Sequence, residues 1–158
     1  GTDAGGCSKP VLNRALVGAD AAVLAKAAGL TAPAQTQLLF GETDVDSPFV
    51  QEEQMMPFIP LVRCKDVHEA IEMAFQSEHG YGHSAIMHST NIGALTEMGR
   101  RMDCTLFVKN GPSVAGLGMG GEGYINFSIA TTTGEGIVTP ETFTRKRRCV
   151  LVDSLNIV

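Results

Sequence analysis

The stretch Phe58-Ile-Pro-Leu-Val-Arg-Cys64 and the residues after it, Lys65-Asp-Val-His-Glu-Ala-Ile-Glu-Met-Ala-Phe75, decide the fold. The first part is a short apolar run that begins after a proline, which is typical of a buried strand. In the second part Asp66 and Glu69 form a capping-box pattern, which predicts the start of a helix. Apolar residues then recur at helical spacing, at Val67, Ala70, Ile71, Ala74 and Phe75. The stretch therefore predicts a strand that leads into an amphipathic helix.

The alternation of strand and helix continues toward the C-terminus. The first helix is expected to end near His79-Gly80, and Ser84–His88 is predicted to be a short, largely buried strand. Asn91 is expected to cap a second helix, which precedes a strand at Cys104–Val108. The residues of this helix that are predicted to face inward are Ile92, Leu95, Met98 and Met102. Because strands that alternate with helices pair in parallel through right-handed crossovers, the sequence predicts an α/β fold.

The flanking segments complete the expected organisation. A helix over Asp20–Ala28, closed by Gly29, and a strand at Gln37–Phe40 precede a polar, acidic loop. Beyond Asn110, a glycine-rich loop at 111–123 is expected to hold no regular structure, and 124–133 and 142–153 are predicted to be β-rich. We expect three parts: an irregular glycine-rich lead-in over 1–14, the main domain over 15–140, and a strand region over 141–158. Since the chain opens on Gly1, we also expect it to be part of a longer protein.

Composition bounds the class of protein. The 158 residues suffice for one domain, and 44% hydrophobic with 18% charged residues is a globular composition. A net charge of −5 disfavours nonspecific nucleic-acid binding, and the sequence contains no apolar run long enough to cross a bilayer. The four cysteines are widely spaced and form no zinc or redox pair, so we expect reduced thiols in an intracellular setting.

Three suggestive motifs are better explained structurally. Gly116-Leu-Gly-Met-Gly-Gly121 matches the dinucleotide pattern G-x-G-x-x-G, but no helix start follows it. A flexible loop whose backbone packs closely against a ligand or a neighbouring element is therefore favoured over dinucleotide binding. His79, His83 and His88 are interrupted by glycines that oppose a metal site on a helix, and hydrogen-bonded loop histidines are the simpler interpretation. The basic run at 145–148 is typical of an edge strand protected by charges, or of a contact with an acidic subunit surface.

The most informative functional stretch is Glu52-Glu-Gln-Met-Met-Pro57. Alone, its two carboxylates would be ordinary surface acids. In sequence with three later segments, however, it resembles the aldehyde dehydrogenase superfamily. These segments are Tyr81-Gly-His-Ser-Ala85, Phe107-Val-Lys-Asn-Gly111 and the loop from Gly116 to Gly123.

The resemblance is closer to one branch, the CoA-acylating propionaldehyde and acetaldehyde dehydrogenases of bacterial microcompartments. It rests on the ordered motifs Pro48–Pro57, Glu78–Ser89, Phe107–Gly123, Ala130–Gly136 and Thr142–Asp153, and it spans about Leu12 to Val158. It implies an aldehyde dehydrogenase catalytic-domain portion with parallel strands and crossover helices. This portion would end in a β strand that helps to build a homo-oligomer.

The resemblance also implies a chemistry. A cysteine thiolate would attack a short aldehyde, hydride would pass to NAD, and the acyl group would leave the cysteine as a thioester of coenzyme A. Glu53, with Met55 beside it, would bind the cofactor through the nicotinamide ribose. Asn110, Ser113 and Val114 would lie near the aldehyde pocket. No metal and no membrane contact is implied, and the location would be the cytoplasm or the microcompartment lumen.

The departures from the family pattern limit what this chain is expected to do alone. The nucleophilic cysteine of the family should lie upstream of Gly1, because none of Cys7, Cys64, Cys104 and Cys149 has its sequence context. The cofactor domain is also absent, so the chain alone is expected to be inactive. Two alternatives stay open: a non-catalytic assembly module that pairs through Thr142–Val158, and an independent nucleotide-binding domain that uses the glycine-rich loop.

Overall fold

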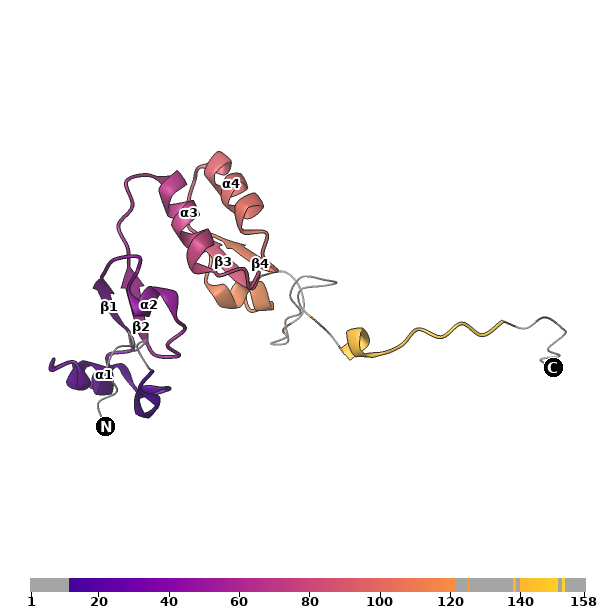
Figure 1. The fold of residues 1–158 in the computed structure, drawn as a ribbon. Coiled ribbons are helices and arrows are strands. Elements are labelled where there is room, and N and C mark those ends of the chain that lie inside the picture. Colours follow the sequence, from indigo (N-terminus) through magenta and orange to yellow (C-terminus); the bar gives the residue numbers. More distant parts are fainter. Residues whose placement is uncertain (1–11, 122–124, 126–137, 139, 151, 153–158) are drawn as a thin grey trace, which may run out of the picture. The chain divides into compact units, whose positions relative to one another are not determined.

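The protein is described by a computed structural model, which defines residues 12–121, 125, 138, 140–150 and 152. The chain falls into two compact units, Gly1–Gly80 and Tyr81–Val158, called here the N-terminal and C-terminal units. The elements of the N-terminal unit are η1 (Arg14–Leu16), α1 (Ala21–Ala27), β1 (Leu39–Glu42), α2 (Pro48–Gln51), β2 (Phe58–Leu61) and α3 (Val67–Ser77). Those of the C-terminal unit are β3 (Ser84–Met87), α4 (Ile92–Met102), β4 (Leu106–Lys109), η2 (Ser113–Leu117) and η3 (Pro140–Phe143) (Figure 1).

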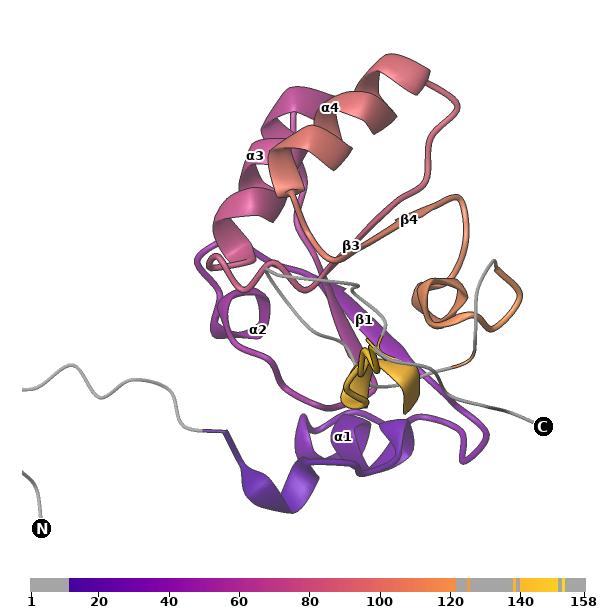
Figure 2. The same ribbon diagram turned by 90° about the vertical axis from the view of Figure 1, so that its right-hand side faces the viewer.

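In the N-terminal unit, β1 and β2 pair in parallel with Leu39 opposite Phe58 and Glu42 opposite Leu61. The short helix α2 connects them and lies against the pair (Figure 2). Its Phe49 ring meets the Phe58 ring of β2 edge to face, with centroids 5.2 Å apart. The sequence pattern did not predict α2, although Ser47 followed by Pro48 is a recognised helix start.

The predicted start of α3 is confirmed. The Asp66 carboxylate accepts a hydrogen bond from the Glu69 amide at 2.9 Å, and the Glu69 carboxylate accepts one from the Lys65 amide at 2.6 Å. The reciprocal bond therefore reaches one residue further back than in a standard capping box. Ile71 is buried on the predicted apolar face, so the helix sits where the spacing of apolar residues placed it.

In the C-terminal unit, β3 and β4 pair in parallel with Ser84 opposite Leu106, and α4 is the crossover between them. The Asn91 side chain caps α4 as expected, accepting from the Ala94 amide at 3.1 Å. Met98 and Met102 are buried, but Ile92 is 77% exposed, so its predicted inward position is wrong. Ile92 and Met98 are six residues apart, which is not a whole number of helical turns, so they point to different faces.

The parallel, crossover-linked α/β fold is confirmed, with two differences in detail. The strands form two separate parallel pairs, β1–β2 and β3–β4, and strand boundaries shift by up to three residues from those predicted. The glycine-rich segment also holds regular structure, because η2 occupies Ser113–Leu117.

The expected strand at 142–153 is not formed in the described residues. Thr142 and Phe143 belong to η3, and residues 144–150 and 152 are in no strand. A strand needs a neighbour to accept and donate its backbone hydrogen bonds, and the described part of the chain supplies none there. The expected strand at 124–133 lies outside the described residues, apart from Ile125.

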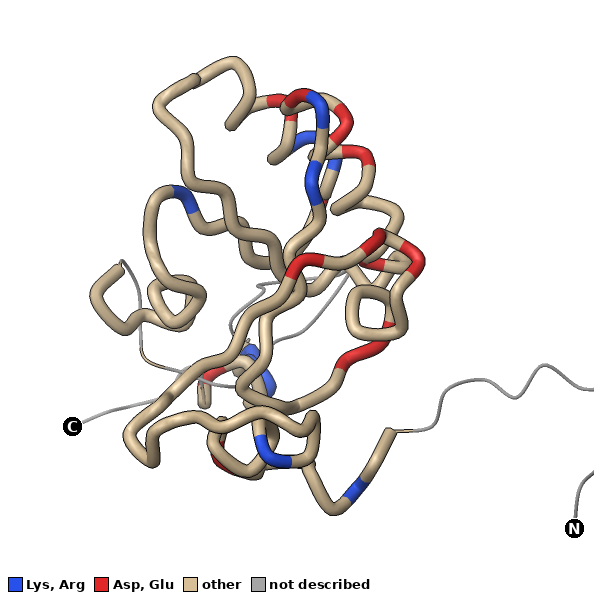
Figure 3. The backbone as a smooth tube through the Cα atoms, turned by 90° about the vertical axis from the view of Figure 1, so that its left-hand side faces the viewer, with Lys and Arg blue, Asp and Glu red and all other residues tan. Residues whose placement is uncertain are grey.

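Charged residues are mixed in sign over the described helices and strands (Figure 3). In α4, for example, Glu97 lies one turn before Arg100 and Arg101. Where the chain is described, no helix is both long and apolar enough to cross a membrane.

Candidate functional site

The first candidate site is the acidic turn, Glu52–Pro57, between α2 and β2. Ser47 caps α2 by accepting from the Phe49 amide at 3.3 Å, and the helix ends when Glu52 takes an extended conformation. The Gln54 side chain then donates to the carbonyl oxygens of Pro48 and Glu52, at 3.1 and 2.8 Å. These bonds fold the turn back on its own helix.

Glu52 and Glu53 are both exposed at this turn. Within the described part of the chain, the Glu53 carboxylate has no hydrogen-bond or ion-pair partner. Its two oxygens can therefore accept hydrogen bonds from a ligand, and neighbouring hydroxyls of a ribose would suit them.

Met55 has a left-handed backbone, with φ of 51°, and its side chain is 65% exposed. A left-handed conformation is uncommon for a residue with a long side chain and is frequent at ligand sites. The Gly18 amide donates to the Met55 carbonyl at 3.1 Å, which holds the strained residue from outside the turn.

The base of the acidic turn is tied to the end of α3. His79 Nε2 lies 3.0 Å from the Gln51 carbonyl oxygen. The Gln51 side chain donates to the Val45 carbonyl at 2.6 Å and lies 3.4 Å from Ser77 Oγ. His79 is thus a hydrogen-bonded loop histidine, as the sequence favoured. Spacing along the sequence gave no indication of the role of Gln51, because its partners lie up to 28 residues away.

The second candidate site follows β4 in the C-terminal unit and contains Asn110, Ser113 and Val114. The Asn110 amide donates to the Met87 carbonyl at 2.9 Å, which closes the β3–β4 pair. The Asn110 side chain bonds twice to Ser89, accepting from its amide at 2.8 Å and donating to its carbonyl at 2.9 Å. Ser113 and Val114 begin η2 and are exposed.

The glycine loop, Gly111–Gly121, is shaped by close packing. A methyl group on Gly116 would lie 3.0 Å from Val108 Cγ2, and one on Gly121 would overlap the Ala115 carbonyl oxygen. Gly118 and Gly120 have left-handed backbones, with φ of 88° and 78°. Gly116 lies inside η2, which is a 3₁₀ turn rather than the α-helix that a dinucleotide-binding loop needs. The structural interpretation of this motif is therefore confirmed at Gly116 and Gly121.

The predicted residues thus form two groups. Glu53 and Met55 share the acidic turn, while Asn110, Ser113 and Val114 share the end of β4 and the start of η2. Asn110, Ser113 and Val114 lie beyond the carboxyl end of β4, where α/β proteins commonly place ligand-binding residues. The acidic turn instead lies at the amino end of β2, and its candidate residues are carried by a loop.

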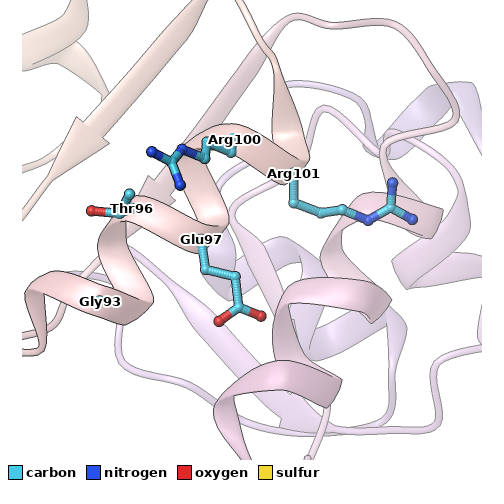
Figure 4. A pocket seen from close by; sticks show the side chains of 5 residues that line it. All are labelled: Gly93, Thr96, Glu97, Arg100 and Arg101. Carbon is cyan, nitrogen blue, oxygen red and sulfur yellow. The ribbon is translucent and has the colours of Figure 1, made fainter.

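A shallow hollow elsewhere in the C-terminal unit contains none of the predicted site residues. It lies on the outer face of α4 and is lined by Gly93, Thr96, Glu97, Arg100 and Arg101 (Figure 4). The two arginines point in different directions, so they do not converge on a common ligand.

The cysteines are positioned as follows. Cys64 is half-buried, with its sulfur 3.6 Å from the sulfur of Met73, and Cys104 is half-buried with its sulfur 3.1 Å from the Leu106 carbonyl oxygen. Cys149 is exposed, and Cys7 lies outside the described residues. Cys64, Cys104 and Cys149 are all free thiols.

Comparison with known proteins places these motifs in a family. The model of the aldehyde dehydrogenase family matches residues 33–126, which include the acidic turn and the whole glycine loop. The chain is 51% identical over 150 residues to an acetylating acetaldehyde dehydrogenase, EutE, of Salmonella typhimurium. It is 46% identical over 148 residues to a CoA-propanoylating propanal dehydrogenase of Citrobacter freundii. These matches cover 95% and 93% of this chain but 32% of each relative, so the chain spans about a third of their length.

Solved structures agree with this result. Propionaldehyde dehydrogenase from Rhodopseudomonas palustris, with bound CoA and an acylated cysteine, superposes with a TM-score of 0.81 at 46% identity. An engineered glycolyl-CoA reductase with bound NADP+ gives the same two values. Each match covers 93% of this chain and 35% of the other. A propionaldehyde dehydrogenase from a fucose-utilisation microcompartment of Clostridium phytofermentans gives 0.82 at 43%, covering 92% of this chain and 34% of the other.

Proposed function

Because this chain belongs to the aldehyde dehydrogenase family and has its α/β fold, we propose that it is the cofactor- and substrate-facing part of a CoA-acylating aldehyde dehydrogenase. The substrate would be a short aldehyde, acetaldehyde or propanal. The observation that carries the proposal is the 46–51% identity, over nearly the whole chain, to relatives named for CoA-dependent oxidation of these two aldehydes.

The reaction would convert an aldehyde, an oxidised nicotinamide nucleotide and CoA thiol into acyl-CoA, the reduced nucleotide and a proton. A cysteine thiolate outside this chain would add to the aldehyde carbon. Loss of hydride from that carbon would leave an acyl thioester on the cysteine. Attack by CoA thiol would then release acyl-CoA and regenerate the cysteine. When bound, the nicotinamide nucleotide supplies the hydride acceptor.

The residues of this chain would bind and orient the reactants. Glu53 is exposed and its carboxylate has no partner among the described residues, so it can accept hydrogen bonds from both hydroxyls of the nicotinamide ribose. The strained backbone of Met55 would fix the direction of the turn that carries Glu53. In the C-terminal unit, Asn110, Ser113 and Val114 would lie near the aldehyde, with the exposed Val114 as an apolar contact for its short chain.

We propose NAD as the nucleotide, because the sequence resembles NAD-dependent enzymes. The NADP+ bound to one similar structure makes a direct comparison of the two nucleotides necessary. A higher kcat/KM with NADP+ than with NAD+ would overturn this part of the proposal. The likeness to a microcompartment enzyme supports a location in the cytoplasm or in a microcompartment lumen.

The test uses the full-length protein that contains this chain. The purified enzyme, given propanal or acetaldehyde with NAD+ and CoA, should form the acyl-CoA thioester together with reduced nucleotide. The 158-residue chain alone should form neither, because it lacks the upstream cysteine. Acyl-CoA formation by the 158-residue chain, or its absence with the full-length enzyme, would contradict the proposal.

A second role, association between chains, is favoured by the segment that begins at Phe143, the last residue of η3. Its apolar side chains are exposed, with Phe143 at 76%, Val150 at 70% and Val152 at 91%. A second copy that pairs with this segment would cover them and supply the missing strand neighbour. Light scattering of the full-length enzyme against a version truncated at Pro140 tests this role. An unchanged mass would exclude it.

A further inference from the structure

The side chain of Asn110 is bonded through both its oxygen and its nitrogen within the protein. Its oxygen accepts from the Ser89 amide and its nitrogen donates to the Ser89 carbonyl, at 2.8 and 2.9 Å. A primary amide aligned with one residue in this way has one amide proton and limited acceptor capacity left for any ligand. Both ends of the amide are already bonded within the protein, which favours a structural role for Asn110.

The backbone of Asn110 is equally constrained. Its φ of 55° is left-handed, a conformation that asparagine tolerates better than most residues. Its amide donates to the Met87 carbonyl, so three hydrogen bonds join Asn110 to the segment from Met87 to Ser89. The left-handed residue turns the chain at the end of β4, and η2 begins three residues later.

The same contacts extend toward α4. Ser89 Oγ accepts from the Asn91 amide at 3.0 Å, and Asn91 caps α4. Hydrogen bonds through Ser89 therefore link Asn110, at the end of β4, to Asn91, the cap of α4. Gly116 of η2 in turn packs against Val108 of β4.

We propose that Asn110 is a positioning residue and not a ligand of the substrate. Its two side-chain hydrogen bonds to Ser89, called here the clamp, hold Ser113 and Val114 in place beside the aldehyde. This inference rests on the proposed function. It predicts that loss of the clamp weakens aldehyde binding selectively. Binding of the nicotinamide nucleotide should be unaffected, because Glu53, its proposed contact, makes no hydrogen bond to Asn110 or Ser89.

The first experiment is Asn110→Ala in the full-length enzyme, with amide hydrogen exchange and steady-state kinetics. The Ser89 amide should exchange roughly tenfold faster, as expected for the loss of one hydrogen bond. The KM for propanal should rise by about tenfold, while the KM for NAD+ stays within about twofold of the wild-type value. Unchanged exchange at Ser89 together with impaired turnover would show a direct substrate contact and would overturn the proposal.

The second experiment uses Asn110→Asp, with Asn91→Asp as the matched control. At pH about 8 the new carboxylate at 110 is ionised. It keeps the bond to the Ser89 amide but opposes the Ser89 carbonyl oxygen. The KM for propanal should therefore rise by roughly tenfold, as in Asn110→Ala.

Asn91→Asp should match the wild type at the same pH, because Asn91 only accepts a hydrogen bond at the helix start and aspartate caps as well. If the KM for propanal were the same in Asn110→Asp as in Asn91→Asp, the donor half of the clamp would be unnecessary and the proposal wrong. This holds even if Asn110→Ala fails to fold. Absence of acyl-CoA formation by the wild type would instead contradict the proposed function, while the exchange measurements would still test the clamp.

Discussion

The acidic turn and the glycine loop obtain their backbone shape from different kinds of residue. In the acidic turn the left-handed position is held by Met55, a residue with a long, exposed side chain, and the flanking carboxylates are exposed. In the glycine loop the left-handed positions are glycines, and two further glycines lie where a methyl group would touch neighbouring atoms. Substitutions in the acidic turn should therefore change binding, whereas substitutions in the glycine loop should change folding.

The largest expected effect is that of Gly121→Ala. The new methyl group would overlap the carbonyl oxygen of Ala115, and backbone cannot move aside as a flexible side chain can. We expect the full-length enzyme to lose about 3 kcal/mol of stability, at the upper end of the cost of overpacking. Thermal or urea unfolding measures this loss.

Gly111→Ala is the matched control within the same loop. Its methyl group would meet its nearest neighbours at 3.5 Å or more, and Gly111 has no left-handed backbone. Its stability should stay within about 0.5 kcal/mol of the wild-type value. Equal effects of the two substitutions would remove the packing explanation for the loop.

Glu53→Gln tests the expectation that substitutions in the acidic turn change ligand binding rather than folding. The amide preserves the shape of the side chain but loses the charge, and its nitrogen cannot accept a hydrogen bond from a ribose hydroxyl. The loss of a charged hydrogen bond should weaken binding of the nicotinamide nucleotide by about 1.5–3 kcal/mol, or roughly ten- to a hundredfold. The free energy of unfolding should be unchanged, since Glu53 is exposed. Glu52→Gln is the control, and an equal effect of both changes on KM for NAD+ would contradict the role of Glu53.

Gly116→Ala is expected to have a smaller effect than Gly121→Ala, because its methyl group meets the side chain of Val108 at 3.0 Å rather than backbone. A cost of about 1–2 kcal/mol is expected from thermal unfolding. Val108→Ala should make room for the new methyl group, so the double variant should be more stable than the sum of the two single changes implies. If the stability changes of the two single variants simply added in the double variant, the contact with Val108 would not be the reason that this position requires glycine.

The same comparison explains what the sequence could and could not predict. Features governed by neighbours along the chain were predictable, and the caps at Asp66 and Asn91 are the clearest cases. The glycines of the loop were expected to allow close packing, but their contacts with Ala115 and Val108 arise only once β4 and η2 have formed. Local pattern alone assigned the wrong face to Ile92.

For the candidate site, the resemblance to a family identified the two segments, but it could not describe their hydrogen bonds. Asn110 was expected near the aldehyde, yet its side chain bonds to Ser89, a residue 21 positions away. Likewise, the bond between His79 and Gln51 spans 28 positions. Such pairs depend on the crossover connections of the fold, so spacing along the sequence does not indicate them.

The smallest expected effect is a loss of helix stability at acid pH. It should occur in the N-terminal unit, which contains the acidic turn, and not in the C-terminal unit, which contains the glycine loop. α3 of the N-terminal unit is capped by Asp66, whereas α4 of the C-terminal unit is capped by Asn91, which does not titrate. The hydrogen bond from the Glu69 amide lowers the pKa of Asp66 below its ordinary value of 3.8. Since this pKa is lower in the folded protein, the cap stabilises α3 fully above pH 3.8, and its contribution is lost as pH falls further, through the lowered pKa.

Exchanging the two caps tests this difference directly. Hydrogen exchange in the full-length enzyme should show the start of α3 losing protection between pH about 4 and about 2, while the start of α4 does not. Asp66→Asn should remove the acid dependence from α3, and Asn91→Asp should introduce it into α4. Both caps accept one hydrogen bond from the amide three residues ahead, so each substitution gives one helix the capping side chain of the other. If α3 kept its acid dependence in Asp66→Asn, another carboxylate of that unit, with Glu69 the first candidate, would be responsible.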